Sequence, residues 1–209
     1  MKGLHDDAPG RAGDPEPRSG GVSVEVTGLS KRLGRRTILE DISFRVEPGE
    51  VVGLFGPNGA GKSTLIRIIS GLSRASAGNV KLDGESVDEL GARWRSRIGV
   101  LLHESFLYNG LSARENLLFY ARMHGIPRAE STIDRILERM GLSLFAFDPV
   151  GGFSRGMHQR LAIARSLVHD PSLLLLDEPF SGLDQQGASL LLEILERLKE
   201  RGRTIILIS

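Results

Sequence analysis

The glycine-rich segment at residues 56–63 constrains this chain more than any other part of its sequence. It matches the pattern G-x-x-x-x-G-K-[ST] and follows Val51–Phe55, an apolar run typical of a strand. Apolar residues then recur at the spacing of one helix face. Glycines let consecutive backbone N–H groups turn toward a phosphate, and a helix start adds partial positive charge. We therefore expect an α/β fold built around a strand, a phosphate-binding loop and a helix.

The chemistry expected of this loop is the binding of a nucleotide's phosphates together with Mg²⁺. Lys62 is expected to reach the β and γ phosphates, and the Ser63 hydroxyl to ligate Mg²⁺. An ordinary glycine-rich turn would leave the lysine and the preceding strand to coincidence. The residues of this segment that are expected to contact the nucleotide are Gly56, Pro57, Asn58, Gly59, Ala60, Gly61, Lys62, Ser63 and Thr64.

Two carboxylates follow a second apolar run, Leu173–Leu176, which is typical of a buried parallel strand. Ligands bind at the carboxyl ends of such strands. Asp177 is expected to hold Mg²⁺ directly or through water, and Glu178 to orient or deprotonate the attacking water. The alternative, that both residues merely cap the next helix, is disfavoured by the phosphate loop in the same chain.

The composition narrows the class of partner. Lys and Arg total 27 against 26 for Asp and Glu, so no overall field attracts nucleic acid or an anionic surface. The absence of cysteine excludes disulfides, thiolate zinc sites and a cysteine nucleophile. No apolar run approaches the roughly 20 residues that a membrane-spanning helix needs.

The chain divides into a tail and one domain. Residues 1–20 mix glycine, proline and charge and are predicted to be disordered, whereas residues 21–209 form the domain. A capping box at Ser112–Glu115 opens a helical subdomain spanning about 104–169. The chain stops within the apolar run 204–208, which predicts that a C-terminal piece is missing.

The segment Phe153–Met157, followed by His158–Arg165, makes the chain resemble the ATP-binding cassette (ABC) ATPases over essentially Val22–Ser209. In that family the signature L-S-G-G-Q precedes a helix whose start faces the γ phosphate held by the other subunit. A hydroxyl, a glycine and a helix start, all retained here, can still receive an anion. The signature residues implied are Ser154, Arg155, Gly156 and Met157, of which the serine and Gly156 match the usual pattern.

The resemblance also implies a fold and an assembly. The fold is a P-loop NTPase core, a mixed sheet with flanking helices, with an N-terminal antiparallel β portion and a helical insert. Two chains would form a homodimer around ATP and Mg²⁺, bound to a transmembrane permease at the cytoplasmic face of the cell membrane. ATP hydrolysis would power transport. The family's D-loop, along the subunit interface, corresponds to Ser181, Gly182, Leu183 and Asp184.

Three positions depart from the family pattern. Leu33 stands where an aromatic residue usually stacks on adenine, so aliphatic contact would replace stacking. His103 replaces the usual glutamine; imidazole suits Mg²⁺ poorly, so His103 is expected to contact water or phosphate, or to be only a loop residue. The family's switch histidine would follow Ser209, so we expect the natural gene to continue with histidine. Without that histidine the chain would bind ATP but hydrolyse it poorly.

The transported molecule is less constrained. The stretch His103–Arg122 and the sequence Phe153–Met157 look like the CcmA-like ATP-binding subunits of haem exporters in cytochrome c maturation. Phe106–Tyr108 is expected either to seat a permease helix or to pack the helical insert. The alternatives are an exporter of drugs, lipids or ions, and a non-transport ABC ATPase.

Overall fold

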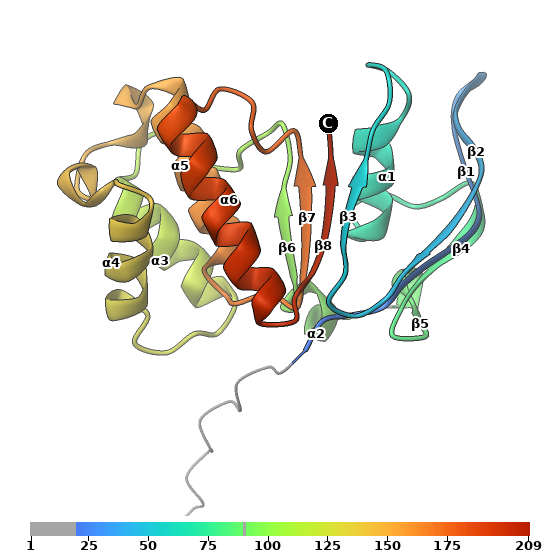
Figure 1. The fold of residues 1–209 in the computed structure, drawn as a ribbon, viewed down its shortest axis with the longest axis horizontal. Helices are drawn as coiled ribbons and strands as arrows, with labels where there is room; N and C mark the ends of the chain where they lie inside the picture. The colour runs from blue at the N-terminus through green and yellow to red at the C-terminus, as the bar shows by residue number, and fades with distance from the viewer. Residues whose placement is uncertain (1–19, 90) are drawn as a thin grey trace, which may run out of the picture.

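Two four-stranded sheets organise the computed structural model, which describes residues 20–89 and 91–209 (Figure 1). The tail predicted over residues 1–20 lies outside the described residues, except for Gly20. The first sheet is antiparallel, in the order β2-β1-β4-β5. Its strands are β1 (Val24–Leu33), β2 (Arg36–Val46), β4 (Ala77–Leu82) and β5 (Glu85–Ser86).

The second sheet is parallel, in the order β3-β8-β7-β6. Its strands are β3 (Val51–Leu54), β6 (Ile98–Leu101), β7 (Leu173–Asp177) and β8 (Thr204–Ile208). All five residues of β7 are buried. A strand buried on both faces cannot alternate polar and apolar residues, which explains the continuous leucine run.

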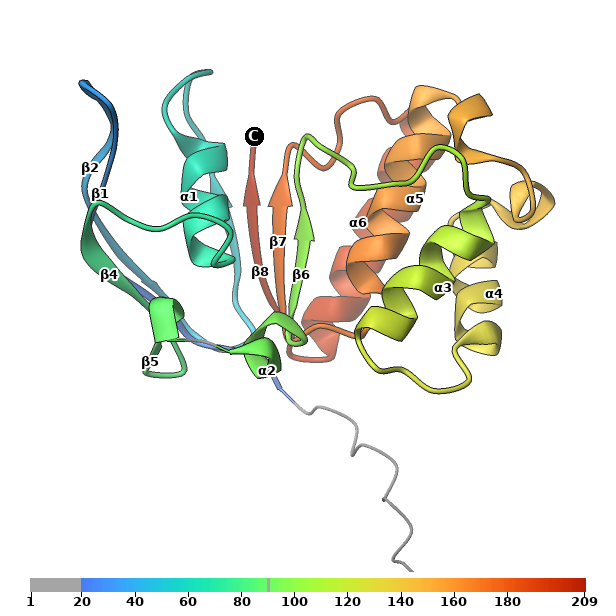
Figure 2. The same ribbon diagram turned by 180° about the vertical axis from the view of Figure 1, so that it is seen from behind.

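Helices cover both faces of the parallel sheet (Figures 1 and 2). Helix α1 (Lys62–Ile69) lies between it and the antiparallel sheet. The other face is covered by α5 (Arg155–Leu167) and α6 (Gln185–Glu200), with α3 (Ala113–Met123) and α4 (Glu130–Arg139) packed outside them. Alternate leucines of β7 join different cores: Leu174 and Leu176 pack with α3–α6, and Leu173 and Leu175 with α1 and the antiparallel sheet.

Short elements complete the chain: α2 (Ala92–Arg95) and the 3-10 turns Val87–Glu89, Ser143–Phe145 and Val150–Gly152. None of these was predicted, and neither were β4 and β5. Among the described residues, no helix combines the length and the apolar character needed to cross a bilayer.

The α/β fold class, with its antiparallel N-terminal portion, is confirmed. Helix α6 begins at Gln185, because the Asp184 carboxylate caps it by accepting a 2.7 Å hydrogen bond from the Gly187 N–H.

The capping box predicted at the start of α3 is present. The Ser112 hydroxyl accepts from the Glu115 N–H at 3.2 Å, and the Glu115 carboxylate accepts from the Ser112 N–H at 2.8 Å. Those hydrogen bonds from Ser112, first the backbone N–H and then the hydroxyl, hold the pKa of Glu115 below its ordinary value near 4.5. They favour the ionised carboxylate, so the capping contribution is complete above that ordinary value and is lost as pH falls through the lowered pKa.

Replacing Glu115 with glutamine should therefore reduce the free energy of unfolding more at pH 7 than at pH 3.5. Urea unfolding of both proteins across this range measures the difference, which should shrink below about pH 4.5. Glu196→Gln is the control, because among the described residues the Glu196 carboxylate has no hydrogen bond or ion pair. A difference for Glu115→Gln that stays constant with pH would contradict this assignment.

Candidate nucleotide-binding site

The loop between β3 and α1 presents the start of a helix with free donors. Gly61 is the N-cap of α1, and no side chain caps this end. The first turn of the helix also contains no acidic residue. Its backbone N–H groups therefore remain available to an anion, with the partial positive charge of the helix start behind them.

Two glycines of this loop have positive φ, but only one is also crowded. Gly59 has φ +83° and Gly61 has φ +85°. A Cβ at Gly61 would lie 2.7 Å from both the Ile38 carbonyl oxygen and Leu39 Cδ2 of β2, whereas one at Gly59 would meet nothing within 4 Å. The antiparallel sheet therefore supports the loop from behind, and only glycine fits at the contact.

Lys62 lies against the same loop. Its Nζ donates to the carbonyl oxygens of Gly56 at 2.5 Å and Pro57 at 3.1 Å. A lysine ammonium has three donors, so one remains for a phosphate oxygen. The two loop carbonyls thereby hold the Lys62 ammonium beside the loop that is predicted to bind the triphosphate.

Asp177, at the end of β7, is a buried carboxylate. The residue is 6% exposed, and among the described residues its carboxylate has no hydrogen bond or ion pair. Its oxygens are not among the fully buried side-chain atoms that lack a partner, so a cation can reach them. Helix α1, which carries Ser63 in its first turn, packs against β7. Carboxylate and hydroxyl oxygens are the ligands that Mg²⁺ prefers, so Ser63 and Asp177 fit the predicted metal.

Glu178 occupies a very different environment. It is exposed, and its φ of +47° lies in the left-handed region, which costs a non-glycine residue about 1–2 kcal/mol. Its N–H donates to the Ile208 carbonyl at 2.9 Å, which holds the turn against β8. Strain of this kind concentrates at functional sites. The two neighbouring carboxylates are thus separated into a buried and an exposed one, as their different predicted roles require.

His103 reaches the same edge of the sheet. In the parallel pair of β6 with β7, Leu101 lies opposite Leu176, so His103 and Glu178 each stand two residues beyond that pair. His103 is exposed. The next residue, Glu104, forms an ion pair with Arg67 of α1, which ties this segment to the phosphate-loop helix.

An arginine that the sequence did not single out holds the segment after His103. Arg165 of α5 donates to the Val100 carbonyl at 2.6 Å, and its guanidinium lies 5.5 Å from the Phe106 ring centre and 5.3 Å from that of Tyr120. Burial lowers the pKa of this guanidinium. The Tyr120 hydroxyl donates to the Phe106 carbonyl. Within the segment predicted to seat a permease helix, Phe106 and Tyr108 are exposed, whereas Leu107 packs against the core.

The signature segment and the D-loop are joined within the chain, which the sequence did not predict. Ser154 caps α5 by accepting from the Met157 N–H at 3.3 Å. The Arg155 guanidinium donates to the Ser181 hydroxyl at 2.8 Å and covers Gly182, whose φ is +76°. Arginine in place of the usual glycine therefore links the two segments.

The signature does not join the phosphate loop of its own chain. Helix α5 begins on the opposite side of the parallel sheet from the loop before α1, and both views agree (Figures 1 and 2). The β1–β2 tip, where Leu33 is 58% exposed, stands at the same end of the molecule as the phosphate loop. Lys62, Asp177, Glu178 and His103 thus stand at one edge of the parallel sheet, whereas Ser154 and Gly156 stand on its other side.

The crowding at Gly61 predicts unequal effects of two alanine substitutions. Gly59→Ala should cost about 1 kcal/mol of unfolding free energy for its positive φ alone. Gly61→Ala should cost on the order of 3 kcal/mol, since the methyl group also meets Ile38 and Leu39. Urea unfolding of the two variants checks this. Equal losses would show that the loop does not rest on β2.

Comparison with known proteins places this geometry in a family. The profile of the family described as ABC transporter matches residues 39–181. The linearmycin resistance ATP-binding protein LnrL of Bacillus subtilis (strain 168) is 40% identical over 185 residues, covering 88% of this chain and 60% of that protein. The lantibiotic transport ATP-binding protein SrtF of Streptococcus pyogenes is 41% identical over 186 residues, covering 89% of this chain and 79% of that protein.

A solved structure of an ATP-binding cassette has the same fold. The dimeric ATP-binding cassette MJ0796, bound to ADP and Pi in a post-hydrolysis state, superposes with a TM-score of 0.80 at 26% identity. The match covers 89% of this chain and 87% of that one. The chain spans only 60% of the length of LnrL, so the likeness covers only that portion of LnrL. With more than half of its residues matched by the family profile, and relatives about 40% identical, the chain belongs to the ATP-binding cassette (ABC) transporter family.

Proposed function

We propose that this protein binds ATP with Mg²⁺ and hydrolyses it to drive an ABC exporter. The observation that supports this most directly is the convergence of different groups at one edge of the parallel sheet. The phosphate loop with Lys62 follows β3, Asp177 ends β7 and Glu178 comes directly after it, and His103 follows β6. A binding loop, a buried carboxylate and an exposed one at a single edge suit phosphoryl transfer to water.

Binding would use the loop backbone and three side chains. The backbone N–H groups between Gly56 and Thr64, apart from Pro57, which has none, would surround the β and γ phosphates, and Lys62 would add a charge-assisted hydrogen bond. Ser63 and Asp177 would hold Mg²⁺, which when bound neutralises charge on the phosphate oxygens. Leu33 would contact the adenine through its aliphatic side chain. Its exposure leaves it free to do so.

Hydrolysis would use Glu178. A water attacks the γ phosphorus while Glu178 accepts its proton, the bond to the bridging oxygen breaks, and the products are ADP and phosphate. His103, two residues beyond β6, is suited to contact that water or a γ-phosphate oxygen. Its imidazole is a poor ligand for Mg²⁺, so we assign no metal contact to it.

A second copy of the chain would complete the site. Ser154, Arg155, Gly156 and Met157 open α5 away from their own phosphate loop, so an anion that they receive belongs to another subunit. The dimeric cassette MJ0796 has this fold and carries ADP and Pi. The D-loop Ser181–Asp184, bonded to Arg155, would transmit nucleotide state from one signature segment to the neighbouring site.

The partner that uses this energy would be a transmembrane permease, with the dimer docked at the cytoplasmic face of the cell membrane. LnrL and SrtF are named as ATP-binding proteins of linearmycin resistance and lantibiotic transport. These names favour export of an organic molecule or peptide. Phe106 and Tyr108 are exposed, and the Phe106 ring lies against the Arg165 guanidinium. They are the side chains best placed to receive a permease helix.

Two substitutions separate binding from chemistry. Lys62→Ala should weaken Mg·ATP binding by about ten- to a hundredfold, because it removes a charge-assisted hydrogen bond to phosphate. Glu178→Gln should retain binding but lower turnover by about 10²–10⁴-fold, and should accumulate an ATP-bound dimer. Calorimetry, phosphate release and light scattering measure the three quantities. Undiminished turnover in Glu178→Gln would refute its assignment as the general base.

The stretch His103–Arg122 and the sequence Phe153–Met157 suggest haem as the transported molecule, and this stays a prediction. The names of LnrL and SrtF point instead to antibiotics and lantibiotics. The genes beside this one decide between the two. A cytochrome-maturation permease would support haem export, whereas a drug- or peptide-export permease would support the broader exporter assignment.

A further inference from the structure

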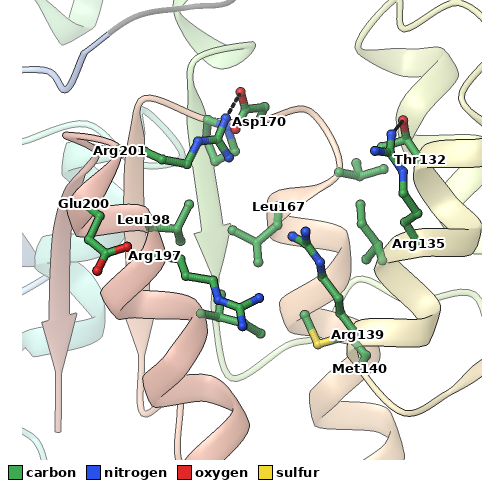
Figure 3. A pocket seen from close by; sticks show the side chains of 14 residues that line it. Thr132, Arg135, Arg139, Met140, Leu167, Asp170, Arg197, Leu198, Glu200 and Arg201 are labelled. Atoms are coloured by element: carbon green, nitrogen blue, oxygen red, sulfur yellow. Dashed lines mark hydrogen bonds and ion pairs between the residues drawn. The ribbon is translucent and has the colours of Figure 1, made fainter.

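A cleft of about 570 Å³ lies at the end of the parallel sheet opposite the nucleotide-binding site. Its walls are α4 and the last two turns of α6, and its base is the end of α5 (Figure 3). Asp170 and Pro171, which line it, precede β7 and so stand at the amino end of that strand. A volume of this size suits a small organic ligand.

Four arginines line this cleft, from two helices that face one another. Arg135 and Arg139 come from α4, and Arg197 and Arg201 from the end of α6. In each pair the two arginines are four residues apart, a spacing at which like charges repel. Figure 3 shows the Arg139 and Arg197 guanidinium groups extending from opposite walls into the middle of the cleft. The helix dipole favours arginine in a last turn, but it does not explain why two helices direct arginines at one opening.

The carboxylates near the cleft compensate the positive charge of these arginines only in part. Asp170 already accepts from Arg201 at 3.1 Å and from Arg203 at 2.7 Å. Glu200 lies on the far side of Arg197 from Arg139 (Figure 3). Glu193 approaches Arg197 only at 3.7 Å in a solvent-exposed pair, which contributes little. Arg139 has no ion pair or hydrogen bond among the described residues.

The floor between the arginines is apolar. Figure 3 shows Leu167 in the centre of the cleft next to the Arg139 guanidinium, with Leu198 on the α6 side and Met140 on the α4 side. Ile136 and Ile194, both half-buried, extend this surface along the two walls. The cleft therefore offers guanidinium groups for an anionic head and aliphatic side chains for an apolar body.

We propose that this cleft binds an amphipathic organic anion, with its phosphate or carboxylate head between Arg139 and Arg197 and its apolar body on Leu167. Guanidinium groups bind such heads through paired, charge-assisted hydrogen bonds. The bound molecule would bridge α4 and α6 across the end of α5, the helix that Ser154 caps at its other end. This proposal does not depend on ATP hydrolysis, and a protein without turnover would still bind the anion.

Calorimetry with octyl phosphate, kept below its micelle-forming concentration, tests the proposal on the purified protein. One molecule should bind per chain, and octanol and inorganic phosphate should each bind at least about tenfold more weakly. Arg139→Gln/Arg197→Gln should weaken octyl phosphate binding by at least about tenfold. Both side chains are exposed, so their replacement should leave the circular dichroism spectrum unchanged.

Two controls locate the binding. Arg95→Gln/Arg122→Gln removes the same charge from exposed positions outside the cleft and should keep full affinity. Lys62→Ala should also keep it, since the phosphate loop lies at the other end of the sheet. Unchanged affinity in Arg139→Gln/Arg197→Gln would overturn the proposal. So would a protein that ignores octyl phosphate but sediments with phosphatidylglycerol vesicles through these arginines, because the cleft would then serve a membrane surface.

Discussion

The burial of β7 on both faces is the constraint on which the rest of the structure depends. Its five residues lie between two hydrophobic cores, one formed with α1 and the antiparallel sheet and the other with α3–α6. This position fixes where β7 ends and leaves Asp177 buried at the edge of the sheet. At Glu178 the backbone turns through a left-handed conformation. As a result, two adjacent carboxylates have different environments: Asp177 is buried and Glu178 is exposed. One buried strand thus positions both the candidate metal ligand and the candidate base.

The same sheet explains why the candidate site and the signature lie apart. The phosphate loop precedes α1 on one face of the parallel sheet, while Ser154 opens α5 on the other. In the dimer that we propose, a second copy of the chain would bring the phosphate loop of one subunit to the signature segment of the other. The Arg155–Ser181 hydrogen bond connects the signature segment to the D-loop, and the hydrogen bond from Arg165 to the Val100 carbonyl connects α5 to β6.

Much of this architecture could be predicted because its signals are local. The loop pattern, the leucine run before Asp177 and the Ser112–Glu115 capping box each depend on residues close together in sequence. What escaped prediction depends on distant contacts. Gly61 is required because β2 approaches it, and Arg165 matters because Phe106 and Tyr120 fold over it. Strands β4 and β5 were missed because Asn79, Lys81 and Glu85 interrupt their apolar pattern.

Binding of ATP that requires Mg²⁺ tests the central claim most directly. Calorimetry of the purified protein with ATP should show one nucleotide bound per chain in the presence of Mg²⁺ and much weaker binding with EDTA, since Ser63 and Asp177 then lack their cation. Equal affinity with and without Mg²⁺, or no binding at all, would contradict this account of the sheet edge.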